Sequence, residues 1–140
     1  MATLNPFVKF NDGKCREAME FYKSVFGGEV EFMTVAGSPM EKDMPAEKKD
    51  LIMHSTLTKN GWMLIGSDMM RDKAVVGDNV GLSLSCESDE EIKTIFAKLS
   101  EGGNVFMPLE DAFWGATFGM VTDKYGIEWM LNFQKVPMTK

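Results

Sequence analysis

Cysteine, histidine and long apolar runs are scarce in this 140-residue sequence. The two cysteines, Cys15 and Cys86, have neither the CxxC nor the CxxH spacing of zinc sites, and they predict no disulfide framework. No apolar run approaches the ~18 residues that cross a bilayer, and the first residues contain no apolar signal-peptide core. We therefore expect a protein of the reducing cytoplasm that does not insert into membranes. We expect neither cysteine to be a nucleophile.

Positive charge is also scarce. The sequence has 15 Lys and Arg against 21 Asp and Glu, a formal net charge of -6. Such a surface repels phosphate backbones, and no basic run is longer than the pair Lys48 and Lys49. This balance argues against nucleic acid as a partner. The remaining composition, 44% hydrophobic with 10 Phe, 3 Trp and 2 Tyr, is typical of one globular domain.

An internal repeat is the most informative feature of the sequence. Two apolar stripes follow the spacing i, i+3, i+4, i+7 of an amphipathic helix, and each ends at a Gly-Gly pair. The stripes superpose at an offset of 74 residues; they are Ala18, Phe21, Tyr22 and Val25, then Ile92, Ile95, Phe96 and Leu99. The repeat predicts two copies of one supersecondary unit.

Local signals place the other elements. Ser88 and Glu91 have the spacing of a capping box, and Asn60-Gly61 between apolar runs predicts a tight hairpin. In the first half we expect strands near 5–10, 28–35, 51–58 and 62–67 with a helix at 14–26. In the second half we expect strands near 79–86, 104–108, 115–122 and 127–133 with a helix at 89–101. The stretch 37–50 is a loop that has no counterpart of equal length in the second half. It is either a variable loop or a lid over a site.

The predicted fold class is therefore α+β, with two tandem βαβββ modules in a single domain over 1–140. Module one spans about 4–68 and module two about 79–134. A βαβββ unit buries only one face of its sheet, so two units must pack to close a core. We expect a curved mixed sheet with a cleft that holds a ligand.

Several stretches of the chain resemble a known family. They are 21–28 (FYKSVFGG), 52–54 (IMH), 64–68 (LIGSD), 113–116 (FWGA), 118–126 (FGMVTDKYG) and 129–132 (WMLN). These stretches resemble the PhnB-like branch of the vicinal-oxygen-chelate superfamily, which includes glyoxalase I, bleomycin-resistance proteins and extradiol dioxygenases. The resemblance covers about residues 5–133 and implies the glyoxalase/bleomycin-resistance-like fold. It also implies a homodimer, because clefts of this superfamily are often completed across a two-fold interface.

The resemblance also implies where a metal would be held. Superfamily enzymes bind a divalent metal through His and Glu side chains on the first and last strand of each module. In this chain the corresponding positions hold Pro6 or Phe7, Met63 (or Leu64 in the next register), Leu82 and Met130. Thioethers are poor ligands for Zn, Mg, Mn or Fe(II), so we expect no metal and no other cofactor. Some members of the branch are labelled ubiquinone-pathway methyltransferases. The chain has no glycine-rich nucleotide loop after a strand, and we set that label aside.

His54, the single histidine, has two interpretations. If it points into the cleft it can bind an anionic or carbonyl ligand or act as a general base; otherwise it is a structural residue bonded to a neighbour. Glu110 and Asp111 are adjacent, so in an extended segment they point apart and form no catalytic pair.

The candidate ligand-binding residues combine aromatic and thioether side chains with a few polar residues at the rim. The chain is rich in methionine, a flexible and polarizable side chain that suits apolar or aromatic guests. The candidates are His54, Trp62, Met63, Ser67, Asp111, Phe113, Trp114, Trp129 and Met130.

Three functions follow from these observations. The first is a metal-free homodimer that binds and sequesters a small molecule. The second is a superfamily enzyme, of the lyase, isomerase or dioxygenase type, with a noncanonical site around His54. The third is a protein whose pocket is filled by its own Met and Phe side chains.

Overall fold

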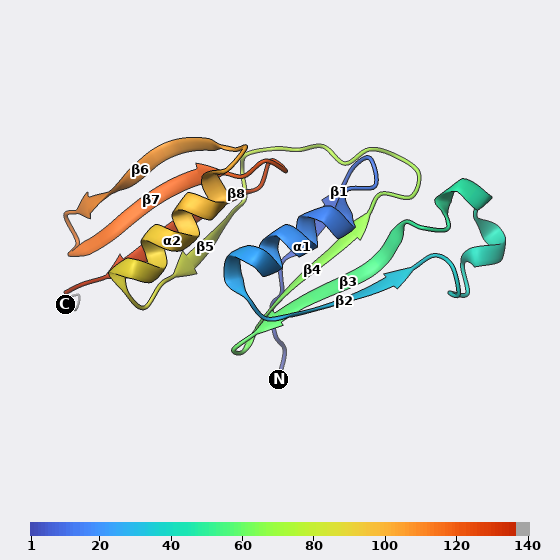
Figure 1. The fold of residues 1–140 in the computed structure, drawn as a ribbon, viewed down its shortest axis with the longest axis horizontal. Helices are drawn as coiled ribbons and strands as arrows, with labels where there is room; N and C mark the ends of the chain where they lie inside the picture. Colours follow the sequence, from blue (N-terminus) through green and yellow to red (C-terminus); the bar gives the residue numbers. More distant parts are fainter. Residues whose placement is uncertain (137–140) are drawn as a thin grey trace. The chain divides into compact units, whose positions relative to one another are not determined.

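The computed structural model describes residues 1–136. The chain divides into two compact units, Met1–Val75 and Val76–Lys140, and each is described by itself (Figure 1). The unit boundary lies between the two predicted modules. Within residues 1–136, no helix is both long and apolar enough to cross a membrane.

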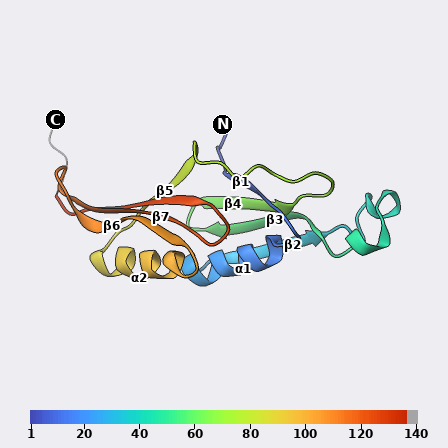
Figure 2. The same cartoon turned by 90° about the horizontal axis from the view of Figure 1, so that it is seen from above.

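The first unit has the predicted βαβββ order. Its elements are β1 (Phe7–Phe10), α1 (Cys15–Phe26), β2 (Glu29–Thr34), β3 (Ile52–Lys59) and β4 (Trp62–Asp68). The strands form one mixed sheet in the order β1-β4-β3-β2, with β1 parallel to β4 and the other pairs antiparallel. Helix α1 covers one face of this sheet (Figure 2).

The second unit repeats this arrangement. Its elements are β5 (Gly81–Ser85), α2 (Asp89–Ser100), β6 (Asn104–Ala112), β7 (Ala116–Thr122) and β8 (Glu128–Gln134). The sheet order is β5-β8-β7-β6, with β5 parallel to β8. The α+β class and the internal repeat are confirmed. The strands form two four-stranded sheets, and the cleft expected between the modules stays a prediction.

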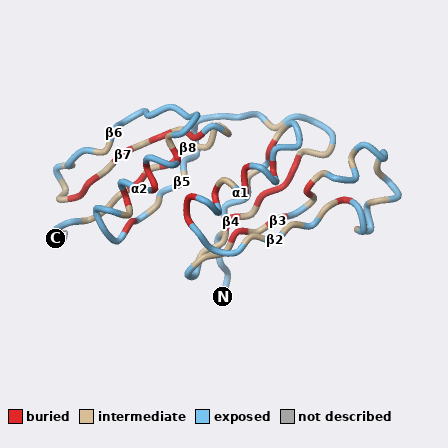
Figure 3. The backbone as a smooth tube through the Cα atoms, in the orientation of Figure 1, coloured by how far each residue is buried: buried red, intermediate tan, exposed pale blue. Residues whose placement is uncertain are grey.

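Each core lies between a helix and the sheet beneath it (Figure 3). The second apolar stripe is buried in full, and three of the four residues of the first stripe are buried. Phe21 is only half-buried, whereas Met19 is fully buried. Gly66 on β4 leaves room for Met19, because a Cβ there would lie 3.0 Å from the Met19 sulfur.

The predicted hairpin at Asn60-Gly61 is confirmed. Both residues have positive φ, 42° and 90°, and Lys59 pairs with Trp62 across the turn. A two-residue turn of this kind matches the right-handed twist of the strands. The turn therefore sets the β3–β4 register, which decides the face on which each side chain lies.

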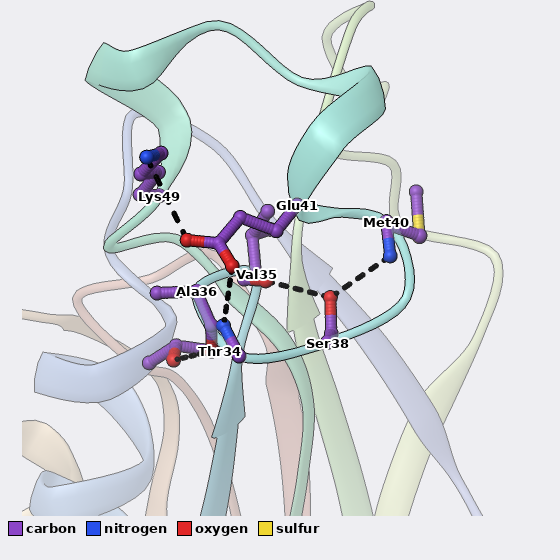
Figure 4. Close-up of polar contacts among 8 residues, drawn as sticks. Thr34, Val35, Ala36, Ser38, Met40, Glu41 and Lys49 are labelled. Atoms are coloured by element: carbon purple, nitrogen blue, oxygen red, sulfur yellow. Dashed lines mark hydrogen bonds and ion pairs between the residues drawn. The ribbon is translucent and has the colours of Figure 1, made fainter.

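The stretch 37–50 extends beyond the ends of β2 and β3 and contains two short 3-10 turns, Glu41–Asp43 and Ala46–Lys48 (Figure 1). The Glu41 carboxylate accepts the Gly37 N–H at 3.2 Å and lies 3.6 Å from the Lys49 ammonium (Figure 4). Ser38 Oγ donates to the Val35 carbonyl at 2.6 Å. These bonds give the loop its own internal structure; whether it acts as a lid stays open.

The main difference from the sequence prediction is the length of β6. We expected this strand near 104–108, but it continues to Ala112. The ladder with β7 contains two register shifts, and these bulges accommodate Pro108 within an edge strand. Glu110 and Asp111 therefore lie on a strand, where neighbours point to opposite faces as expected for an extended segment.

Candidate functional site

Each sheet has a face covered by its helix and an opposite face, which we call the open face. The glycines identify the covered side, because a Cβ on Gly66 would meet Met19 of α1 and one on Gly119 would lie 2.8 Å from Phe96 of α2. Side chains alternate along a strand, so the neighbours of these glycines belong to the open faces. The covered face carries core side chains, whereas the open face of each sheet is not packed against its helix.

On the first sheet, three predicted site residues lie on the open face. Met63 pairs with Thr58, and His54 lies one position beyond the Ser55–Gly66 pair, beside Ser67. His54 and Ser67 thus lie at one end of this face and Met63 at the other. The His54 ring is exposed and forms no hydrogen bond with a residue of the described range 1–136. Within residues 1–136, His54 is therefore not a structural residue bonded to a neighbour, and its role in ligand binding stays a prediction.

Trp62 lies on the helix-covered side. Its ring packs edge-on against Phe26 at the end of α1, with 5.7 Å between centroids. A cavity of about 570 Å³ nevertheless reaches both Trp62 and Met63 at the β3–β4 turn. Its other wall is the segment before β1, and sequence reasoning missed this wall because no local pattern predicts where that segment packs. The lining residues there are Thr3, Leu4, Asn5 and Pro6.

On the second sheet, Met130 lies on the open face and Trp129 does not. Met130 pairs with Met120 on β7 and Ser83 on β5. Trp129 is buried in the core, and its indole N–H donates to the Asp123 carboxylate at 2.8 Å. The structure therefore separates these two candidates, which are neighbours in the sequence.

Trp114 joins Met130 on the open face of the second sheet. Its indole N–H donates to Asn132 Oδ1 at 3.1 Å, and its ring packs edge-on against Phe118 at 5.3 Å. Phe118 pairs with Asn132, so both belong to this face. Phe113 extends the aromatic group outward: it is 97% exposed and contacts Trp114 at 5.0 Å.

Phe118, Met120 and Asn132 are among the open-face residues of the second sheet that sequence reasoning missed. Phe118 and Met120 are two residues apart, as are Met130 and Asn132, which is the spacing of side chains on one face of a strand. That spacing was a usable signal once the strands were assigned.

Asp111 lies away from the aromatic group. It pairs with Thr117, which belongs to the covered side, and it is exposed at the sheet edge. The Lys135 ammonium donates to the Asp111 carboxylate, and this bond with its charge lowers the pKa of Asp111. The structure explains Asp111 as one partner of a surface ion pair.

Neither cysteine has the surroundings of a nucleophile, as expected. Cys15 is fully buried at the start of α1, and burial raises the pKa of its thiol to about 11. Burial likewise raises the pKa of Cys86 to about 11. A buried thiol of high pKa is mostly protonated near neutral pH and reacts slowly.

The residues at the implied metal positions do not fit a divalent metal. Phe7 and Met63 lie on the open face of the first sheet, and Met130 on that of the second. Leu82 pairs with Trp129 on the covered side, so Ser83 faces the open side in its place. Within residues 1–136, no three His, Cys, Asp or Glu side chains are grouped closely enough to hold a metal ion.

Comparison with known proteins identifies the family. A family model described as 3-demethylubiquinone-9 3-methyltransferase matches residues 2–132. Protein YjdN of Escherichia coli K12 is 28% identical over 151 residues, covering 98% of this chain and 99% of its own.

Solved structures agree. Protein PA1353 of Pseudomonas aeruginosa is 37% identical with a TM-score of 0.85, covering 96% of this chain and 98% of its own. A Bacillus cereus protein is described as a putative 3-demethylubiquinone-9 3-methyltransferase, PhnB protein. It is 30% identical with a TM-score of 0.75, covering 94% of this chain and 99% of its own.

A glyoxylase/bleomycin resistance protein/dioxygenase domain from Frankia shares the fold. Its TM-score is 0.68 at 11% identity, over 96% of this chain and 92% of its own. The chain therefore belongs to the PhnB-like family, whose model carries the methyltransferase description, and it shares its fold with solved glyoxalase/bleomycin resistance/dioxygenase proteins.

Proposed function

We propose that this protein is a metal-free homodimer that binds and sequesters a small apolar or aromatic molecule on the open faces of its sheets. One observation carries the proposal: the positions that the resemblance implies for metal ligands hold Phe7, Met63, Leu82 and Met130, and Ser83 takes the place of Leu82 on the open face. These side chains offer apolar contact and one hydroxyl, which suits an apolar guest better than a metal.

The aromatic group of the second sheet supports this proposal. Trp114 is held by its bond to Asn132 and by its contact with Phe118, so its ring is oriented before a ligand arrives. A ring that is already oriented loses little conformational entropy on binding. The methionines beside it adapt to the shape of the guest.

The first experiment measures the metal content of the purified, untagged protein by elemental mass spectrometry. Titration with Ni, Zn and Mn follows, with thermal unfolding as the readout. We expect no stoichiometric metal and no stabilisation by these ions, and we expect members of an apolar aromatic ligand library to raise the unfolding temperature. Near-stoichiometric metal would reject the metal-free proposal and favour an enzyme.

The methyltransferase description of the family is not part of the proposal. Each sheet is four-stranded and mixed, and α1 or α2 covers a single face. Within residues 1–136 the strands form no doubly wound parallel sheet with a glycine-rich loop, the usual nucleotide-binding arrangement. Calorimetric titration with S-adenosylmethionine tests this choice, and we expect no heat of binding.

A second function, catalysis at His54, is favoured by one observation: the ring is exposed on the open face beside Ser67 instead of packed into the core. An imidazole there can act as a general base toward a bound molecule. The variant His54→Ala separates the two functions. A sequestering protein keeps most of its affinity, whereas a His54-dependent enzyme loses turnover by about a hundredfold or more.

The homodimer is supported by the outer edge of the second sheet. Strand β6 has no neighbour on one side, and its Val105, Phe106 and Met107 side chains are exposed. Apolar edge strands are normally covered. Light scattering coupled to gel filtration should give twice the 15.7 kDa of the chain, and a monomer mass would reject the dimer.

The compartment we propose is the cytoplasm. Cys15 and Cys86 are both free and buried, which suits a reducing environment where thiols need no pairing. Cell fractionation with an antibody against the protein tests this assignment.

A further inference from the structure

The open face of the second sheet is negatively charged. The register places two carboxylates on it: Glu110 pairs with Phe118, and Glu128 pairs with Thr122. None of the residues that the β5–β8 register places on this face is a lysine or an arginine. Among residues 1–136, no basic side chain forms an ion pair with either carboxylate. Within the described residues, the negative charge of these two carboxylates is therefore not neutralised by a direct ion pair.

Between the two carboxylates lies an apolar surface. Met107, Met120 and Met130 are register partners, so three methionines from three strands form one row across the sheet. The next pair of β7 and β8 side chains on this face is Phe118 and Asn132. The Trp114 ring packs against Phe118. Glu110 belongs to the same row as Phe118, while Glu128 lies on the other side of the methionine row.

These features select one kind of ligand. Thioether and aromatic surfaces bind flat apolar bodies, and the faces of Trp and Phe rings attract cations. Carboxylates near an apolar surface attract positive charge and repel anions. An anionic guest would meet uncompensated negative charge on this face, whereas a cationic guest would be attracted by both the carboxylates and the rings.

We propose that the open face of the second sheet binds planar aromatic cations, with the flat body on Trp114, Phe118 and the methionine row and the positive charge near Glu110 or Glu128. This inference rests on the proposed small-molecule function and names its ligand class. The first sheet differs, because its open face carries the cation Lys9, which pairs with Ser67, beside the carboxylates Glu29 and Glu31. The preference for cations should therefore belong to the second sheet.

Three probes of one ring system test the charge preference on the full chain near neutral pH. They are proflavine, which is cationic, acridine, which is neutral, and acridine-9-carboxylate, which is anionic. We expect proflavine to bind about tenfold more tightly than the carboxylate in a fluorescence titration, and we expect added salt to reduce this ratio. Equal affinities for the three probes, or tighter binding of the anion, would overturn the inference.

A matched pair of double variants tests whether the preference for cationic probes arises on the second open face. Glu110→Gln with Glu128→Gln removes both carboxylates from the second open face, and Glu29→Gln with Glu31→Gln removes two from the first. Glu29 and Glu31 pair with Thr58 and Thr56 and are exposed, so both double variants change the net charge equally. We expect the first pair to reduce the proflavine preference about fivefold and the second to leave it nearly unchanged. An equal effect of both pairs would assign the preference to net charge and reject the site.

The variant Trp114→Ala tests whether the aromatic group of the second sheet contacts the probes. We expect it to weaken proflavine and acridine binding by a similar factor, because it removes ring contact from both probes. Unaltered affinity for both probes would reject the site. The two proposals fail differently: acridine binding without a charge preference overturns only the inference, whereas absence of any ligand from the probes and the wider library overturns the proposed function as well.

Discussion

The two helices begin in different ways, although the two units repeat one order of elements. Helix α2 begins at Ser88, whose hydroxyl accepts the Glu91 N–H at 3.0 Å, and Glu91 in turn accepts the Glu87 N–H at 2.7 Å. Helix α1 follows Lys14, which provides no side-chain cap. The Cys15 N–H instead donates to Asp68 on β4, 53 residues further along the chain, at 2.9 Å.

This difference separates local from long-range stabilisation. The capping group of α2 is three residues from its partner and solvent-exposed, so water can replace it. Asp68 is buried and also accepts the Ile52 N–H at 2.8 Å, so it joins α1, β3 and β4. We expect the two units to respond unequally when their caps are removed.

The largest expected effect comes from Asp68→Ala. The variant leaves the Cys15 and Ile52 N–H groups buried without an acceptor, and each such group costs about 1–3 kcal/mol. We expect a loss of about 3 kcal/mol in the free energy of unfolding, measured by urea denaturation. Asp68→Asn keeps one acceptor and should lose less. A loss below about 1 kcal/mol for Asp68→Ala would contradict the long-range cap.

The next effect compares two glycines on the helix-covered sides of the sheets, Gly66 on β4 and Gly119 on β7. A Cβ on Gly119 would lie 2.8 Å from both Leu109 and Phe96 and 3.1 Å from the Met107 carbonyl, whereas on Gly66 it would meet only side chains, none closer than 3.0 Å. Overpacking of this kind costs about 1–3 kcal/mol. We expect Gly119→Ala to destabilise the protein by about 2 kcal/mol and Gly66→Ala by less. The opposite order in urea denaturation would show that the second core relaxes more easily than its contacts indicate.

The two buried thiols should make stability fall at alkaline pH. In the folded protein the pKa of each thiol is raised from 9.0 to about 11, so the unfolded chain ionises first. The stabilisation is therefore complete below pH 9.0 and declines as the pH rises toward about 11. We expect each thiol to contribute about 1–2 kcal/mol to this decline, measured as unfolding free energy against pH.

Cys15→Ala and Cys86→Ala are the controls for this pH dependence. Each should remove its own share of the decline, and the two shares should be similar. An alkaline profile that neither variant changes would assign the decline to other groups.

The smallest effect is expected for Ser88→Ala. Loss of an exposed N-cap hydroxyl costs about 1 kcal/mol. We expect a shift of this size in urea denaturation, and Ser88→Asp should restore most of the stability because aspartate also caps helices. A Ser88→Ala effect equal to that of Asp68→Ala would remove the distinction between the two helix starts.

The candidate site stays a prediction, and the strand register divides its residues between the two faces of the sheets. Methionine and aromatic side chains do occupy the open faces, and the resemblance directed attention to Met63 and Met130. Their sequence neighbours Trp62 and Trp129 lie on the covered sides, because consecutive side chains of a strand point to opposite faces. Composition alone grouped these pairs together, and only the register separated them.

The sequence by itself determined the repeat, the two helices, the order of the strands, the Asn60-Gly61 turn and the Ser88 cap. These features depend on residues within a few positions of one another, so periodicity and turn chemistry are sufficient to predict them. The tertiary structure alone decided that Asp68 caps α1, that Cys15 is fully buried, and that Trp114 packs beside Asn132 and Phe118. Such contacts depend on strand register and on the face of the sheet that the helix covers, and both arise only when distant segments pack together.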